Sequence, residues 1–183
     1  MSNFFEKIGF IGIGLMGYSF VQRLQQAKYH VHVYDKDKNR LKLLNSLKNL
    51  SFDESPCEIS SQCDLIFICV DTTENVENIV FGENGIVQDA SKKTIIVDLS
   101  TTFADMTIIF SKNLKLKKGS SWIDAPVSGG PSKALDGSLA IMMGGDKAKI
   151  KQIQIVLETL SSNFTHFGPV GSCLLYTSPS PRD

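Results

Sequence analysis

The sequence predicts an α/β fold in which a doubly wound, mostly parallel sheet is covered by helices on both faces. Apolar runs of strand length recur along the chain, and segments of helix length lie between them. With 183 residues, of which 42% are hydrophobic and 21% charged, the chain is long enough to bury the core of one ordinary domain. We therefore expect residues 1–172 to form a single domain.

The alternation is clearest before residue 120, where we expect strands at residues 8–11, 30–34, 65–70 and 94–97. Helices are expected at residues 15–26, at 38–47, where leucines recur at helical spacing, and in a segment that ends near residue 116. A short helix is expected after Ser55, because Ser55, Pro56 and Glu58 match a capping box. The run 65–70 is apolar on both faces, as is typical of a central parallel strand.

After residue 120 the predicted strands become shorter and are separated by glycines. We expect strands at 122–124, 139–143 and 164–167, with a helix near 147–160. No internal repeat or low-complexity linker precedes residue 172, which agrees with one domain of ordinary size.

Charge and cysteine content exclude several classes of function. The 19 basic and 19 acidic residues are interspersed, so we expect neither nucleic acid nor an anionic membrane as partner. The N-terminus lacks the pattern of a signal peptide, and no segment is apolar for the ~20 residues of a membrane span, so we expect a cytoplasmic protein. The four cysteines lack metal-ligand spacing, and no metal site is expected.

A glycine-rich segment between the first strand and the first helix points to a dinucleotide. Gly12 allows a tight turn, Gly14 lets backbone N–H groups approach a pyrophosphate, and Gly17 allows close packing of helix on strand. We expect the whole segment to contact the cofactor, including the intervening Ile13, Leu15 and Met16.

Asp35 ends the second strand, where a carboxylate can bind the hydroxyls of the adenosine ribose. This position favours NAD over NADP, whose 2′-phosphate the carboxylate would repel. Two alternatives stay open. Asp35 caps a loop without binding a ligand, or the nearby cations hold a 2′-phosphate, so that NADP is also accepted; these cations are Lys36, Lys38 and Arg40.

The motif from Gly9 to Gly17 resembles the start of the β-hydroxyacid dehydrogenases, the group of 3-hydroxyisobutyrate dehydrogenase and tartronate semialdehyde reductase, and the resemblance covers residues 7–172. It implies a Rossmann-type domain, the NAD-binding domain also found in 6-phosphogluconate dehydrogenase. It further implies that Val70, Asp71 and Asn75 contact the cofactor from the loop after the fourth strand of the family's sheet. Asp71 replaces a proline of many members, which alters the stiffness expected for this loop.

Two further segments carry the resemblance. The segment 98–101 is similar to the family's D-x-S-T motif, which implies that Thr101 lies near the nicotinamide; the alternative is that Thr101 caps the following helix. The segment 124–130 is similar to the family's DAPVSGG substrate loop, which implies that Ser128, Gly129 and Gly130 bind the substrate. A hydroxyl beside two glycines suits a small carboxylate.

The chain departs from the family after residue 172. The resemblance places a catalytic lysine near Thr177, on a long helix that Pro179 and Pro181 would interrupt, so no catalytic residue is assigned and we expect this fragment to be inactive. Residues 173–183 also correspond to one reading frame of a transposase adaptor used for sequencing libraries. We expect them to be an artefact of assembly and disordered; a natural truncation is the alternative.

The resemblance implies an NAD-dependent oxidoreductase that transfers a hydride between the nicotinamide and a small β-hydroxyacid, such as 3-hydroxyisobutyrate or the glycerate and tartronate semialdehyde pair. The family's helical C-terminal domain is expected to be absent from this chain, and a complete form is expected to be a homo-oligomer. The alternative, which the missing lysine permits, is a catalytically inactive Rossmann module that senses nucleotides or binds proteins.

Overall fold

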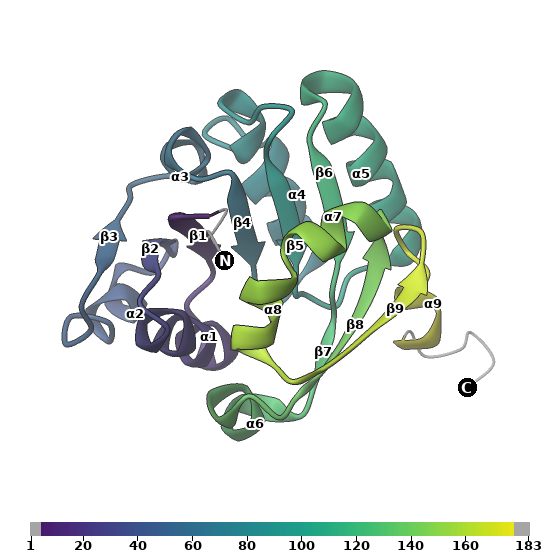
Figure 1. Ribbon diagram of the computed structural model, residues 1–183. Coiled ribbons are helices and arrows are strands. Elements are labelled where there is room, and N and C mark those ends of the chain that lie inside the picture. The colour runs from purple at the N-terminus through teal and green to yellow at the C-terminus, as the bar shows by residue number, and fades with distance from the viewer. Residues whose placement is uncertain (1–4, 178–183) are drawn as a thin grey trace.

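The computed structural model describes residues 5–177, and it shows an α/β fold with a mostly parallel sheet (Figure 1). The strands are β1 (Lys7–Ile11), β2 (His30–Tyr34), β3 (Leu50–Phe52), β4 (Leu65–Ile68), β5 (Ile95–Asp98), β6 (Ser121–Asp124), β7 (Val127–Ser128), β8 (Ala140–Gly145) and β9 (Asn163–Gly168). The helices are α1 (Leu15–Gln26), α2 (Lys38–Lys42), α3 (Pro56–Gln62), α4 (Thr73–Phe81), α5 (Ala104–Lys118), α6 (Gly130–Asp136), α7 (Lys147–Gln152), α8 (Gln154–Leu160) and α9 (Leu174–Thr177), with a 3₁₀ turn η1 (Ile86–Gln88).

The sheet has the strand order β3-β2-β1-β4-β5-β6-β8-β7, and β9 pairs with β8. The six strands from β3 to β6 run parallel, whereas β8 is antiparallel to β6 and β7 is antiparallel to β8. From β1 the chain first builds outward to β2 and β3 and then returns to add β4 on the other side. This reversal lies between β1 and β4, where open α/β sheets bind ligands outside the carboxyl ends of their strands.

Two apolar clusters cover the two faces of the sheet, as the prediction of a doubly wound fold requires. The first contains Phe20 and Leu24 of α1 with Leu157 of α8, and the second contains Val76 of α4 and Phe110 of α5. Figure 1 shows α1 and α8 on the near side of the sheet. The strands between the clusters are apolar on both faces, since all four residues of β4 are buried.

Several predicted elements differ in extent from the structure. The helix expected at residues 38–47 ends after Lys42, and turns follow it, although Leu41 and Leu44 are buried as the spacing indicated. The helix expected near 147–160 is divided at Ile153 into α7 and α8. The edge strand β3, the strand β7 and the helices α4 and α6 were not predicted. The elements β3, β7 and α6 are short, and short elements carry little periodicity.

The expected disorder from residue 173 differs from the structure in its first residues. Cys173 and Leu174 are buried, and α9 begins at Leu174. Residues 178–183, which complete the segment expected to be disordered, lie outside the described residues.

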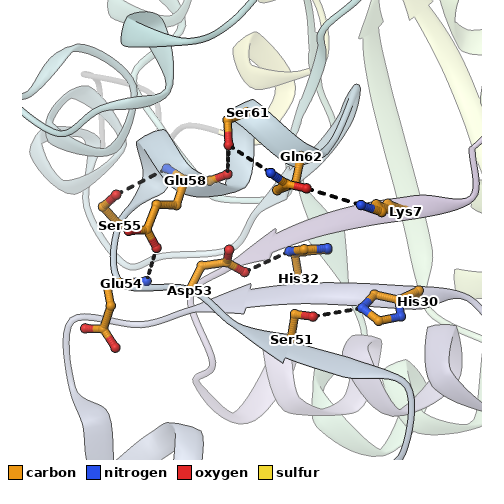
Figure 2. Close-up of polar contacts among 10 residues, drawn as sticks. All are labelled: Lys7, His30, His32, Ser51, Asp53, Glu54, Ser55, Glu58, Ser61 and Gln62. Carbon is orange, nitrogen blue, oxygen red and sulfur yellow. Dashed lines mark hydrogen bonds and ion pairs between the residues drawn. The ribbon is translucent and has the colours of Figure 1, made fainter.

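A polar cluster lies where β2 and β3 face α3 (Figure 2). The His32 Nδ1 and Asp53 Oδ2 atoms are 3.0 Å apart, and His30 Nε2 lies 2.8 Å from Ser51 Oγ. The predicted cap of α3 is present, since Ser55 Oγ accepts a hydrogen bond from the Glu58 N–H at 3.2 Å. The Glu58 carboxylate, however, accepts its bond from the Glu54 N–H. These contacts fix the segment that brings Pro56 to the cavity described below.

Candidate functional site

The candidate site is a cavity of about 730 Å³ at the carboxyl ends of β1, β2 and β4, where the strand order reverses. Predicted residues that line it are Gly12, Gly14, Leu15, Met16, Gly17, Asp35, Val70, Asp71 and Asn75. Predicted residues from three separate segments of the sequence therefore meet here, as the parallel sheet predicts. The side chain of Ile13 points instead into the core, where it is 1% exposed.

The glycine segment forms a cradle that larger residues would fill. Gly12 has a φ of 97°, and a Cβ there would collide with the carbonyl oxygen of Cys69. A Cβ on Gly17 would collide with the carbonyl oxygen of Gly12, so this glycine brings α1 against the end of β1. Gly14 is different, because its nearest neighbour would be an Arg40 guanidinium nitrogen at 3.8 Å.

The N-terminus of α1 begins at this cradle, and no side chain among residues 5–177 caps it. The first N–H groups of a helix have no partner within the helix, and together with the helix dipole they favour an anion. Because Gly14 and Leu15 also line the cavity, these groups lie where a pyrophosphate of a dinucleotide would be bound. The residues present therefore fit a dinucleotide cofactor.

Asp35 holds the cradle in place from the end of β2. Its Oδ2 accepts the Ile13 N–H at 2.7 Å and its Oδ1 accepts the Asp37 N–H at 2.8 Å. The residue is 4% exposed, and an Arg40 guanidinium nitrogen lies 3.6 Å from Oδ2. Both oxygens thus accept backbone N–H groups of the protein, as the loop-capping alternative for Asp35 expects, although each oxygen can accept a further bond, such as one from a ribose hydroxyl.

The loop after β4 is joined to the loop after β2 through Asn75. The Asn75 amide donates to Asp71 Oδ1 at 2.7 Å, and its oxygen accepts from Lys36 Nζ at 3.3 Å. The hydrogen bond from Asn75 holds the pKa of Asp71 below its usual value, and the charge of Lys36 acts in the same direction. The stiffness that a proline would provide at residue 71 is replaced by a side-chain bond between residues 71 and 75.

The predicted substrate residues Ser128, Gly129 and Gly130 do not line this cavity, and neither does Thr101, which was predicted to lie near the nicotinamide of the cofactor. Thr101 is exposed in the loop after β5, and it does not cap α5, which begins after Phe103 without a side-chain cap. Ser128 ends β7 and is exposed, and Gly129 and Gly130 follow it with φ values of 139° and 75°. These positive φ angles favour glycine, but only Gly130 is open, because a Cβ on Gly129 would meet the side chains of Lys133 and Leu139.

Sequence reasoning missed part of the cavity wall, namely Tyr34, Pro56, Cys69, Asn78, Ile79 and Asn84. Asn78 and Ile79 follow Asn75 by one helical turn on α4, so helical periodicity beyond Asn75 was a signal for them. Pro56 and Asn84 come from separate segments that only the fold brings together. The cations Lys36 and Arg40 line the same cavity, as the NADP alternative requires.

Cys69 is a wall residue of the cavity, and burial raises the pKa of its thiol to about 12, which disfavours the nucleophilic thiolate. Within residues 5–177, no three or more His, Cys, Asp or Glu side chains are grouped to hold a metal ion. In the same part of the chain, no helix is both long and apolar enough to cross a bilayer.

Residues 7–168 match the family described as the NAD binding domain of 6-phosphogluconate dehydrogenase. The chain is 37% identical over 165 residues to 2-hydroxy-3-oxopropionate reductase of Escherichia coli, an alignment that covers 90% of this chain and 56% of that protein. It is 32% identical over 167 residues to a Dictyostelium discoideum protein named "Probable 3-hydroxyisobutyrate dehydrogenase, mitochondrial", covering 91% of this chain and 51% of that protein.

The fold is also similar to that of a solved structure, Mycobacterium tuberculosis 3-hydroxyisobutyrate dehydrogenase with L-serine. The TM-score is 0.86 at 24% identity, and the alignment covers 94% of this chain and 57% of that chain. The chain therefore spans about half the length of the curated relatives it matches, 56% and 51% for the two above.

Proposed function

Because this chain belongs to the family of NAD-binding domains of 6-phosphogluconate dehydrogenase, we propose that it holds NAD(H) for hydride transfer to or from a small β-hydroxyacid. Candidate substrates are 3-hydroxyisobutyrate and the glycerate and tartronate semialdehyde pair. The observation that carries the proposal is the cavity in which an uncapped helix N-terminus, a glycine cradle and a buried carboxylate face one another.

Each part of the proposed site has one task. The first N–H groups of α1 bind the pyrophosphate, and Gly14 leaves space for it. Asp35 and Arg40 lie at the adenosine end, and Val70 and Asn75 form the facing wall. Thr101 lies toward the nicotinamide, which when bound supplies the hydride chemistry. Ser128 donates a hydrogen bond to the substrate carboxylate, beside the backbone of Gly129 and the open backbone of Gly130.

We expect the chain to bind NAD(H) more tightly than NADP(H), by about tenfold. The reason is that Asp35 is held by two backbone N–H groups and cannot turn away from a 2′-phosphate, while both nearby cations are already engaged, Arg40 by Asp35 and Lys36 by the Asn75 oxygen. Calorimetric titration with both cofactors measures the difference. Tighter binding of NADP(H) would overturn the assignment of Asp35, and Lys36→Ala with Arg40→Ala would then identify the cations responsible.

We expect no steady formation of NADH from 3-hydroxyisobutyrate or glycerate by this chain, although it binds NAD. Thr177 stands where the family resemblance places the lysine that moves the hydroxyl proton, and no lysine follows Lys151. A spectrophotometric assay of NADH formation with saturating NAD tests this. Sustained turnover would show that another group moves the proton.

A further inference from the structure

Two loops at the carboxyl edge of the sheet are joined by contacts outside the strand ladder. The loop of residues 69–72 follows β4, and the loop of residues 99–103 follows β5. The first lines the cavity through Cys69, Val70 and Asp71, whereas the second carries Thr101. Both strands are central, and the backbone pairing continues only as far as the Leu99 N–H, which donates to the Ile68 carbonyl at 2.8 Å.

Beyond that point, the side chains of a buried aspartate and a serine join the two loops. Asp98 Oδ1 accepts the Ser100 N–H at 3.0 Å, and Ser100 Oγ accepts the Val70 N–H at 3.0 Å. Asp98 is 0% exposed and Ser100 is 4% exposed, so water does not compete for either bond. The position of Val70 in the cavity wall thus depends on Ser100, and that of Ser100 on Asp98.

A second link joins the far ends of the same loops. The Phe103 N–H donates at 3.2 Å to Oγ1 of Thr73, the residue that follows the first loop and begins α4, and the second loop is also held to α5, because the hydroxyls of Thr102 and Thr107 are 2.7 Å apart. Both loops are therefore fixed at two places. A displacement of one loop must move the other.

We propose that Asp98 is a positioning residue which, through Ser100, holds Val70 in the cofactor site and couples the cavity wall to the loop that carries Thr101. The inference rests on the proposed function, since it assigns a role within the same site. Asp98 Oδ1 makes the required bond, whereas Oδ2 has no hydrogen-bond partner among the described residues. Only one oxygen of the carboxyl group is needed, so Asp98→Asn preserves the contact and Asp98→Ala removes it.

The experiment compares NAD(H) affinity by calorimetry for five variants of the whole chain. We expect Asp98→Ala and Ser100→Ala each to weaken binding about tenfold, the effect of losing one buried hydrogen bond. The double variant should bind no more weakly than either single variant, because both changes break one connection. Asp98→Asn should stay within about twofold of wild type.

Ser120→Ala is the matched control. Ser120 is 1% exposed and donates to the Ser91 carbonyl at 2.7 Å, before β6 and away from the loops. It should lower the melting temperature without changing NAD(H) affinity. A readout without cofactor is the hydrogen exchange of the Val70 amide, which should become faster in Ser100→Ala and Asp98→Ala but not in Asp98→Asn or Ser120→Ala.

These measurements distinguish failure of the proposed NAD(H) binding from failure of the positioning role of Asp98. A wild-type chain that does not bind NAD(H) overturns the proposed function, whereas unchanged Val70 exchange in Ser100→Ala overturns the positioning role by itself. Additive losses in the double variant, or an Asp98→Asn variant as weak as Asp98→Ala, also overturn it. If Asp98→Ala does not fold, Ser100→Ala and Asp98→Asn still decide the question.

Discussion

Gly17→Ala should abolish measurable NAD(H) binding and lower the free energy of unfolding by about 3 kcal/mol. The added Cβ would collide with the carbonyl oxygen of Gly12, and a Phe10 ring atom at 3.2 Å closes the other side. Because backbone cannot rotate away as a side chain can, α1 must shift from β1. The shift carries the uncapped N–H groups of the helix away from the position proposed for the pyrophosphate.

Gly14→Ala should also weaken binding, but without the loss of stability expected for Gly17→Ala. Gly14 has a φ of −74°, which alanine adopts without strain, and its Cβ would meet no atom closer than the Arg40 nitrogen at 3.8 Å. The methyl group would instead occupy cavity space beside the helix N-terminus. We expect a melting temperature close to wild type and NAD(H) affinity reduced by about ten- to a hundredfold, or about 1.4 to 2.8 kcal/mol.

Gly130→Ala is the control for backbone strain alone. Its φ of 75° is unfavourable for alanine, but a Cβ there has no neighbour within 4 Å. It should cost about 1 kcal/mol of stability and leave NAD(H) affinity unchanged. Thermal unfolding and calorimetry on the three variants test the argument. Normal binding by Gly17→Ala, or a Gly14→Ala variant as unstable as Gly17→Ala, would contradict the assignment of separate tasks to these glycines.

The sequence predicted the position of the site better than its bonding. Gly12, Gly17 and Asp35 were placed correctly at one edge of the sheet, because a strand, a tight turn and a helix leave few arrangements. The direction of the Asp35 carboxylate was not predictable. A strand pattern fixes which residue ends the strand, but the choice between a ribose and the Ile13 N–H depends on a backbone 22 residues away in sequence.

The same limit explains the unpredicted contacts of residues 69–103. Asp98 and Ser100 were noticed as parts of a motif near the nicotinamide, and their link to Val70 depends on β4 and β5 being neighbours in register. Strand order is a property of the whole sheet and leaves no local pattern. By contrast, the helix cap at Ser55 is a contact between residues three apart, and it was predicted from the sequence.

The free energy of unfolding of Asp98→Asn, relative to that of wild type, should be higher at pH 8 than at pH 4.5. Burial raises the pKa of Asp98 to about 7, and the neighbouring Asp124, whose own pKa burial also raises, acts in the same direction. Asp124 on β6 lies in register with Asp98, and the Cys69 thiol near the end of β4 is the other titratable group beside it. An ionised Asp98 would also leave the charged Oδ2 atom buried without a partner among the described residues.

The direction of this pH dependence follows from whether the folded or the unfolded state holds the Asp98 proton. The unfolded chain releases the Asp98 proton near its ordinary pKa of 3.8, whereas the folded protein keeps it until the pH reaches about 7. Between these values the folded state binds more protons, so the free energy of unfolding falls as the pH rises and the loss is complete above pH 7. The window spans about three pH units at 1.36 kcal/mol each, which limits the loss to roughly 4 kcal/mol.

Asn cannot ionise and keeps the oxygen that accepts the Ser100 N–H, so the variant should lose this part of the pH dependence alone. We expect its stability relative to wild type to increase by about 3 kcal/mol from pH 4.5 to pH 8, measured by urea unfolding at several pH values. Glu83→Gln, which neutralises an exposed carboxylate, is the control. Its stability relative to wild type should change by less than about 0.5 kcal/mol between pH 4.5 and pH 8. Equal pH dependence in wild type and Asp98→Asn would mean that Asp98 ionises as readily in the folded protein as in the unfolded chain. In that case the buried carboxyl would be a charged group, and its bond to Ser100 a charge-assisted one that Asn could not fully replace.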